Sequence, residues 1–277
     1  MEYTELKCSL PERDAAFAEL IMARLGELGF ESFEETGEGL LAYIPSSEFD
    51  PAILNNPDLW PEGVEVEYTW AVIPEQNWNA VWEENFEPVT LAGRCHIRAP
   101  FHPVMPGIEY EIIIEPKMSF GTAHHETTAL MIEYILEEPI EGLTVLDMGS
   151  GTGVLAILAA MRGAADVTAI DNDEWAYRNA VENVEKNKTS GISVYLGDAG
   201  LLSNGKKFDF IIANINRNIL LNDIETYCGS LNKGGTLLMS GFYMEDIAAI
   251  TEAASSFGLV CQGYKDRNNW VAVRYKS

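Results

Sequence analysis

The stretch Val145-Leu146-Asp147-Met148-Gly149-Ser150-Gly151-Thr152-Gly153 decides the fold, and the apolar run Val154 to Ala160 follows it at once. An apolar segment that ends in alternating glycines predicts a buried strand, a tight turn and a helix opening directly from that turn. Glycine has no β-carbon, so such a turn can approach a ligand closely, and the first amides of the helix point into the same space. The stretch therefore predicts a site for a nucleotide-like cofactor.

From residue 127 onward, predicted helices and strands alternate. Helices are predicted over residues 127–136, 154–162, 174–186, 219–231 and 245–257, and strands over 144–148, 166–171, 193–196, 208–213 and 235–240. The last two predicted strands, 259–264 and 270–275, are separated by a short polar segment, which predicts a hairpin. We therefore expect an α/β fold with a doubly wound, mostly parallel sheet and a C-terminal antiparallel hairpin.

The preceding residues divide into two further parts. Residues 1–73 are predicted to follow the order β-α-β-β-α-β, with the second helix over residues 46–55, which is typical of a small ferredoxin-like α+β domain. Residues 74–114 are interpreted as a linker segment, with an irregular proline-rich stretch and one strand near residue 113. Within it, a predicted helix over 77–86 carries Trp78 and Trp82, either as packing anchors or as a ligand box. The third part, residues 115–277, is the predicted cofactor-binding domain.

The net charge of −25 over 277 residues is unevenly distributed. Residues 1–90 contain 20 acidic and three basic residues, whereas residues 91–277 contain 23 acidic and 15 basic residues. Such a surface repels phosphate backbones, which argues against direct nucleic-acid binding. It would attract and steer a basic protein partner, although an acidic surface can also serve solubility alone.

Other compositional signals exclude several classes of protein. No apolar run approaches the roughly 18 residues of a membrane span, and the N-terminus has no basic and apolar leader. The four cysteines, Cys8, Cys95, Cys228 and Cys261, are scattered without metal-ligand spacing. We therefore expect a cytoplasmic protein with reduced thiols, no metal and no membrane partner. The oligomeric state is not indicated.

The glycine spacing and Asp147 distinguish between two cofactor types. Val154 stands where a dinucleotide fingerprint requires its last small residue. The carboxylate of Asp147 would repel a pyrophosphate but attract a sulfonium and an α-ammonium group. These features favour S-adenosyl-L-methionine, held against Gly149, Gly151 and Gly153. Asp147 could alternatively contact only the N-terminus of the following helix.

Four more polar residues are candidates for this site. Asp171, at the end of the next strand, can accept both ribose hydroxyls, a role that nicotinamide enzymes share. Asp198 can meet the adenine edge or stabilise a surface turn. Asn214 can orient an incoming amine and bond the cofactor, or cap the helix that follows. Thr128, together with Thr127, has the position of a helix N-cap.

Four blocks of the sequence, spread over nearly the whole chain, carry a resemblance to a known family. They are Asn77-Trp78-x-x-x-Trp82-x-x-x-Phe86-x-Pro88, Phe120-Gly121-Thr122-x-His124-His125-x-Thr127-Thr128, Val145-Leu146-Asp147-x-Gly149-x-Gly151-x-Gly153 and Ala213-Asn214-Ile215. With these blocks the chain resembles the PrmA family, which methylates the large-subunit ribosomal protein L11.

The resemblance implies a small substrate-recognition domain, a flexible linker and a methyltransferase domain with the class I methyltransferase fold. It places cofactor contacts at Thr128, Gly149, Asp171 and Asn214. Ala123 stands where the family usually has glycine, and alanine restricts positive-φ conformations. The stretch from Asn214 to Arg217 is more polar than the family's usual continuation, which bears on substrate entry.

The resulting expectation is an S-adenosylmethionine-dependent N-methyltransferase that acts on lysine or N-terminal amines of a basic ribosomal protein. One alternative is a methyltransferase of the same fold acting on another protein, an RNA or a small molecule. A more remote alternative is a nicotinamide-dependent oxidoreductase. A cofactor-binding ribosome-assembly protein without methyl transfer is the last possibility.

Overall fold

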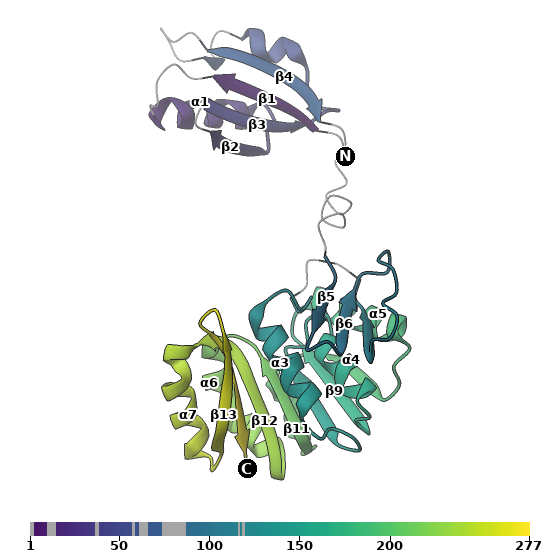
Figure 1. Ribbon diagram of the computed structural model, residues 1–277. Helices are drawn as coiled ribbons and strands as arrows, with labels where there is room; N and C mark the ends of the chain where they lie inside the picture. The colour runs from purple at the N-terminus through teal and green to yellow at the C-terminus, as the bar shows by residue number, and fades with distance from the viewer. Residues whose placement is uncertain are drawn as a thin grey trace. The chain divides into compact units, whose positions relative to one another are not determined.

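The computed structural model describes residues 3–9, 15–36, 39–56, 59–60, 66–73, 87–115, 117 and 120–277. The chain divides into two compact units, Met1–Trp82 and Glu83–Ser277 (Figure 1). Each unit has its own sheet and its own hydrophobic core.

The first unit is a four-stranded antiparallel sheet with one face covered by a helix. Its elements are β1 (Tyr3–Ser9), α1 (Ala15–Glu27), β2 (Ser32–Thr36), β3 (Gly39–Pro45), the 3₁₀ helix η1 (Pro51–Asn55) and β4 (Glu67–Ile73). The strand order β2-β3-β1-β4 confirms the predicted ferredoxin-like arrangement. Leu6 and Cys8 of β1 point to the same face as Leu40 and Ala42 of β3, and all four are fully buried.

The predicted helix over residues 46–55 is wrong in its length. The described residues there form only η1, which begins at Pro51 with Asp50 as its N-cap. Proline has no N–H to donate and its ring would clash with the carbonyl one turn earlier, so a helix cannot run through this position from residue 46.

The second unit contains the elements predicted from the glycine-rich stretch. Its helices are α3 (Glu126–Glu137), α4 (Val154–Met161), α5 (Glu174–Asn187), α6 (Arg217–Ser230) and α7 (Ile247–Ser256), with short 3₁₀ helices η3 (Ala199–Asn204) and η4 (Met244–Asp246). Its main sheet consists of β8 (Thr144–Met148), β9 (Asp166–Asp171), β10 (Ile192–Leu196), β11 (Phe208–Asn214), β12 (Leu231–Tyr243), β13 (Val260–Arg267) and β14 (Trp270–Lys276).

The seven strands lie in the order β10-β9-β8-β11-β12-β14-β13. The pairs from β10 to β12 are parallel, whereas β14 runs antiparallel to both β12 and β13. The predicted doubly wound sheet with an antiparallel hairpin is therefore confirmed. Because β8, β9 and β11 are parallel, their carboxyl ends lie at one edge of the sheet. This fold places its ligands at that edge, where the strand order reverses beside β8.

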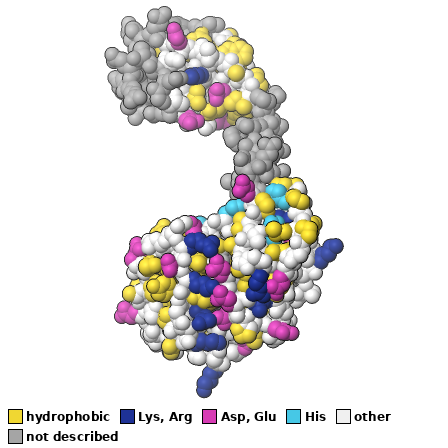
Figure 2. All heavy atoms as spheres, viewed as in Figure 1, with side chains coloured by type: hydrophobic (Ala, Val, Ile, Leu, Met, Phe, Trp, Pro, Cys, Tyr) yellow, Lys and Arg dark blue, Asp and Glu magenta, His cyan; other side chains and the backbone are white. Residues whose placement is uncertain are grey.

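Two separate cores cover the two faces of this sheet. Along β8, Val145 belongs to the core beneath α3 and α4, while Leu146 belongs to the core beneath α6 and α7. This alternation explains why the strand is apolar throughout: both of its faces are buried. Figure 1 shows helices on either side of the sheet, and Figure 2 shows acidic and basic side chains interspersed on the visible surface of this unit.

The segment interpreted as a linker contributes a second, smaller sheet to this unit. Its strands are β5 (Val89–Leu91), β6 (Cys95–Arg98) and β7 (Tyr110–Ile113), in that order. Cys95, Ile97 and Ile112 are fully buried in the core beneath α3 and α4, so they anchor these strands to the second unit. The predicted helix over 77–86, with both tryptophans, lies outside the described residues.

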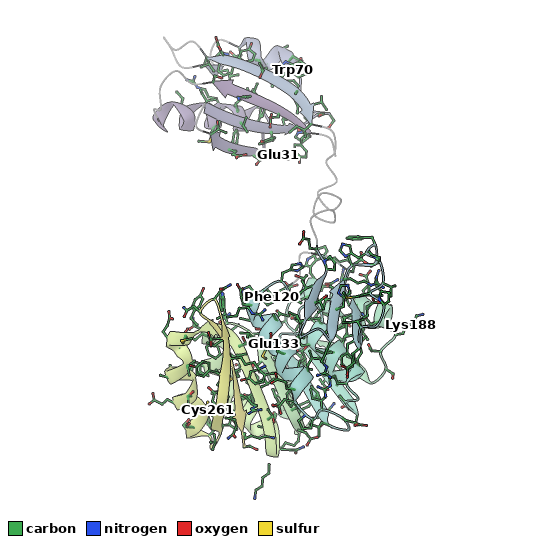
Figure 3. The ribbon with its side chains drawn as sticks, in the orientation of Figure 1. Glu31, Trp70, Phe120, Glu133, Lys188 and Cys261 are labelled. Atoms are coloured by element: carbon green, nitrogen blue, oxygen red, sulfur yellow. The ribbon has the colours of Figure 1, made fainter. Side chains whose placement is uncertain are left out.

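The β13–β14 hairpin is fixed by its turn and by α3. The two turn residues, Asn268 and Asn269, have φ values of 49° and 70°, as a tight primed turn requires. Glu133 of α3, labelled in Figure 3, pairs with Arg267 at 2.7 Å. Among the described residues, no helix has the length and apolar character needed to span a membrane.

Candidate functional site

The glycine-rich turn lies between β8 and α4, beside the ends of β9 and β11. Gly149, Gly151 and Gly153 have φ values of 70°, 53° and 78°, a region that favours glycine. In the sheet register Met148, the last residue of β8, stands opposite Ile170 of β9 and Ala213 of β11. The residues that come next along the three strands are Gly149, Asp171 and Asn214, and they therefore lie together at one edge of the sheet.

Each backbone amide of residues 149–153 donates a hydrogen bond within the protein. Gly149 and Ser150 donate to Ile170 O, Gly151 donates to Asp171 Oδ2, Thr152 donates to Phe120 O, and Gly153 donates to Ser150 O, at 2.7–3.1 Å. A pyrophosphate at such a turn needs these amides as donors. The turn therefore offers a close surface but no cradle for phosphate, which argues against a dinucleotide.

The space that the glycines leave open is occupied by protein. A β-carbon on Gly149 would lie 2.1 Å from Ile215 Cγ2, and one on Gly151 would lie 2.2 Å from Phe120 O. On Gly153 it would lie 3.3 Å from Ala180 Cβ. The glycines are thus required by packing of the loops after β11 and before α3, in addition to any role toward a ligand.

Asp147 is fully buried next to the turn. Its Oδ2 accepts from Ala156 N at 3.0 Å, so the carboxylate contacts the first turn of α4, as the alternative interpretation foresaw. Its Oδ1 is also buried and has no partner among the described residues. Burial raises the pKa of this carboxyl to about 7; the Ala156 amide lowers it, and the nearby Asp171 charge raises it further.

Asp171 closes the turn from the neighbouring strand. Its Oδ2 accepts from Gly151 N at 2.8 Å and its Oδ1 accepts from Asp173 N at 3.0 Å. Each carboxylate oxygen has a second lone pair, so both oxygens can accept another hydrogen bond. Asp171 thus has a structural role that sequence reasoning did not foresee, beside the predicted one.

Asn214 and Thr128 meet across the sheet edge. The Asn214 Nδ2 donates to Thr128 Oγ1 at 3.3 Å, and both residues are at least 90 % buried. The Asn214 Oδ1 is buried without a partner among the described residues. Asn214 does not cap α6: that cap is Asn216, which accepts from Ile219 N at 3.1 Å.

The loop before α3 differs from its prediction at one point. The N-cap of α3 is His125, whose Nδ1 accepts from Thr127 N at 3.3 Å, and neither Thr127 nor Thr128 is the cap. An imidazole nitrogen can replace a hydroxyl oxygen as acceptor, which a preference for hydroxyl caps overlooks. Ala123 adopts φ 67°, the conformation for which glycine is favoured.

Asp198 follows β10 and caps η3. Its Oδ1 accepts from Gly200 N at 2.8 Å, which is the turn role that sequence analysis left open. The same residue lines an open cavity of about 640 Å³ between η3 and α6.

An aromatic rim that sequence reasoning missed lies at the same edge of the sheet. It consists of Phe120, His125, Tyr243 and Trp270, with ring centroids 5.1, 4.7 and 4.1 Å apart in the series Phe120–His125–Trp270–Tyr243. Tyr243 and Trp270 are paired across β12 and β14, and Phe120 is 53 % exposed (Figure 3). The available signal was weak: Phe120 and His125 belong to one of the quoted sequence blocks, but Tyr243 and Trp270 lie far along the chain and share no motif with them.

The residues at the turn fit S-adenosylmethionine by their donor and acceptor chemistry. Asp147 Oδ1 and Asn214 Oδ1 are buried acceptors without a donor among the described residues. An α-ammonium, a sulfonium and ribose hydroxyls supply positive charge and donors, whereas a pyrophosphate supplies neither. The fold and this turn define a class I S-adenosylmethionine-dependent methyltransferase.

Comparison with known proteins shows the family. The model of the family "Ribosomal protein L11 methyltransferase (PrmA)" matches residues 29–277, and the chain belongs to this family. It is 50 % identical over 262 residues to the ribosomal protein L11 methyltransferase of Porphyromonas gingivalis, covering 93 % of this chain and 90 % of the relative. It is 44 % identical to that of Phocaeicola vulgatus, covering 99 % of both.

One solved structure is also similar to this chain. The crystal structure of a ribosomal protein L11 methylase from Lactobacillus delbrueckii subsp. bulgaricus has 28 % sequence identity and a TM-score of 0.64, and it covers 69 % of this chain and 98 % of that one.

The raised pKa of Asp147 predicts how stability depends on pH. An unfolded aspartate has a pKa of about 3.9. A folded pKa of about 7 therefore contributes stability that is complete below about pH 4 and is lost as the pH rises to about 7. In Asp147→Asn, the amide oxygen can still accept from Ala156 N, but the loss with pH disappears. In urea unfolding from pH 5 to 8.5, the unfolding free energy of the variant should rise relative to that of the wild type up to about pH 7. Above that pH the difference between the two free energies should stay constant. A difference that does not change with pH would contradict the shift.

Proposed function

We propose that this chain transfers methyl groups from S-adenosylmethionine to lysine or N-terminal amines of ribosomal protein L11. One observation carries the proposal: the identity to the protein of that name in Phocaeicola vulgatus extends over 99 % of both chains, so both compact units are shared. An enzyme that modifies a ribosomal protein would work in the cytoplasm.

The proposed roles at the site follow from the contacts described above. Gly149, Gly151 and Gly153 form the surface against which the cofactor lies, and Asp147 supplies negative charge for its ammonium group. Asp171 accepts from the ribose hydroxyls. Asp198 lies toward the adenine, and Thr128 supports Asn214. The partnerless oxygens of Asp147 and Asn214 support their roles, and the common sheet edge supports those of Gly149, Asp171 and Asn214. The role of Asp198 rests on its position after β10.

Asn214 is the proposed amine-aligning residue. Its Nδ2 donates to Thr128 Oγ1, and this bond fixes the orientation of the amide. Its Oδ1 has no partner among the described residues and would accept from an amine N–H. The methyl group of S-adenosylmethionine is already activated, so the protein contributes mainly alignment. A lysine amine, with an ordinary pKa near 10.4, must first lose a proton, and desolvation in a buried site lowers its pKa. The aromatic rim would attract the amine while it is still charged.

The proposed division of labour assigns substrate recognition to residues 1–73, a linker role to part of residues 74–114 and methyl transfer to residues 115–277. The described strands within 89–113 belong to the second unit, so the linker we propose is shorter and ends before Val89. On the open face of the first sheet, Glu5 and Glu31 accept from the hydroxyls of Tyr43 and Tyr3. This acidic unit supports capture of a basic protein rather than an RNA.

Labelled S-adenosylmethionine with purified L11, a mixture of the other ribosomal proteins and ribosomal RNA tests the substrate directly. We expect label in L11 alone, with mass spectrometry placing it on amine nitrogens. Label in RNA or in another protein would replace the proposed substrate. Binding of the cofactor without any transfer would indicate an assembly factor instead.

The neighbouring asparagines offer a matched pair of variants. Asn214→Ala should lower kcat for L11 methylation about 100-fold, because the amine loses its aligning acceptor. Asn216→Ala removes only the α6 cap, so it should cost about 1 kcal/mol of unfolding free energy and leave kcat within about threefold. Steady-state kinetics with thermal melts of both variants check this. Equal kcat for the two variants would remove Asn214 from its role.

The acidic first unit predicts a salt-dependent encounter with L11. Raising NaCl from about 50 to 500 mM should increase KM for L11 at least fivefold, because screening weakens long-range attraction between the partners. The affinity for S-adenosylhomocysteine, measured in the same buffers, serves as the control and should change much less. An unchanged KM for L11 would show that charge does not steer this substrate.

A further inference from the structure

We propose that Thr152 is a positioning residue that fastens the loop before α3 onto the glycine-rich turn and thereby sets the affinity for the cofactor. We call the arrangement the Thr152 clasp: Thr152 itself, its acceptors in Phe120 and Gly121, and Asn183 of α5. The proposal concerns the cofactor only and does not depend on the identity of the methylated substrate.

Thr152 holds the loop with two hydrogen bonds. Its backbone N–H donates to Phe120 O at 2.9 Å, and its Oγ1 donates to Gly121 O at 2.7 Å. The side chain is completely buried. The contact is also tight: a β-carbon on Gly121, which has φ 105°, would lie 2.9 Å from Thr152 Oγ1. The loop and the turn are therefore joined through one residue whose hydroxyl has a specific partner.

Asn183 holds the other side of Thr152. Its Nδ2 donates to Thr152 O at 2.9 Å and its Oδ1 accepts from Glu115 N at 2.8 Å, with the side chain fully buried. One turn further along α5, Asn187 accepts from Ile113 N at 2.8 Å and donates to Ile113 O at 2.6 Å. The helix thus binds both the turn and the chain segment that leads to the loop.

The clasp connects the two halves of the cofactor site. The turn carries Gly149 and Gly151, whereas the loop runs through His125 into α3, which carries Thr128 and, through it, Asn214. A cofactor that touches both halves binds only when the loop lies on the turn. The apparent dissociation constant is the intrinsic one divided by the fraction of molecules in that conformation. Loosening the clasp should therefore weaken binding while leaving the chemistry of the bound complex intact.

Three variants separate positioning from general stability. Thr152→Val keeps the shape and the backbone bond but removes the hydroxyl, and Thr152→Ser restores the hydroxyl. The control is Thr144→Val at the opposite end of β8, which removes the bond from Thr144 Oγ1 to Asp209 Oδ2 and the bond that this hydroxyl accepts from Asp209 N. Titration calorimetry with S-adenosylhomocysteine gives Kd, and thermal melts give stability. Hydrogen exchange of the amide at position 152 measures how often the loop leaves the turn.

We expect Thr152→Val to raise Kd about tenfold, with faster exchange of the amide at position 152, which donates to Phe120 O, and an unchanged kcat at saturating cofactor. Thr152→Ser should stay within about threefold of the wild type, and Thr144→Val should melt earlier but bind normally. An unchanged Kd in Thr152→Val, or an equal loss in Thr144→Val, would overturn the proposal. If Thr152→Val does not fold, Asn183→Ala, which removes the donor to Thr152 O, is judged by the same Kd criterion. Failure of the wild type to bind would instead refute the cofactor.

Discussion

The arrangement of the site depends on the hydrogen bonding of one five-residue turn. All backbone amides from Gly149 to Gly153 donate to acceptors within the protein, and these acceptors come from β9, from the loop before α3 and from the turn itself. Leaving a buried amide unpaired costs more than a typical hydrogen bond contributes, so these contacts specify where each neighbouring segment lies. The turn therefore fixes the positions of the segments at this sheet edge through hydrogen bonds within the protein. None of its five amides remains to bind a phosphate.

Because of these contacts, polar side chains that look equivalent in the sequence have different roles in the structure. Asn214 ends β11 and Asn216 follows it, yet Asn216 caps α6 whereas Asn214 donates to Thr128. Asp171 stabilises the turn through Gly151, and Asp147 stabilises the start of α4 through Ala156. Each carboxylate therefore has a folding role that would be needed even without a cofactor. The unpaired oxygens of Asp147 and Asn214 are what remains after these folding roles are met, and they support the proposed binding roles.

Most of the fold of the second unit could be predicted, because its signals are local. Apolar strands between glycines, and helices with regular apolar spacing, identify β8 to β14 and their hairpin within a few residues. The strands β5 and β6 could not be identified from the sequence, because they are only three and four residues long. They form strands because their side chains are buried against α3. The proximity of Asn214 to Thr128 follows from topology combined with resemblance to the family. The aromatic rim depends on contacts between distant segments, so no local pattern predicts it. The His125 cap is a local contact with Thr127, and the preference for hydroxyl caps overlooks it.

The same distinction separates the two sides of the proposed reaction. The cofactor side is built from the turn and from the ends of adjacent parallel strands, which are rigid and close in register. The amine side borders on Phe120, Tyr243 and Trp270, which belong to a loop, a strand end and the beginning of the antiparallel strand. Methyl transfer needs the donor fixed before the acceptor arrives, since only alignment is left for the protein to provide. A site with its strand-borne half toward the cofactor and its loop-borne half toward the amine meets that requirement.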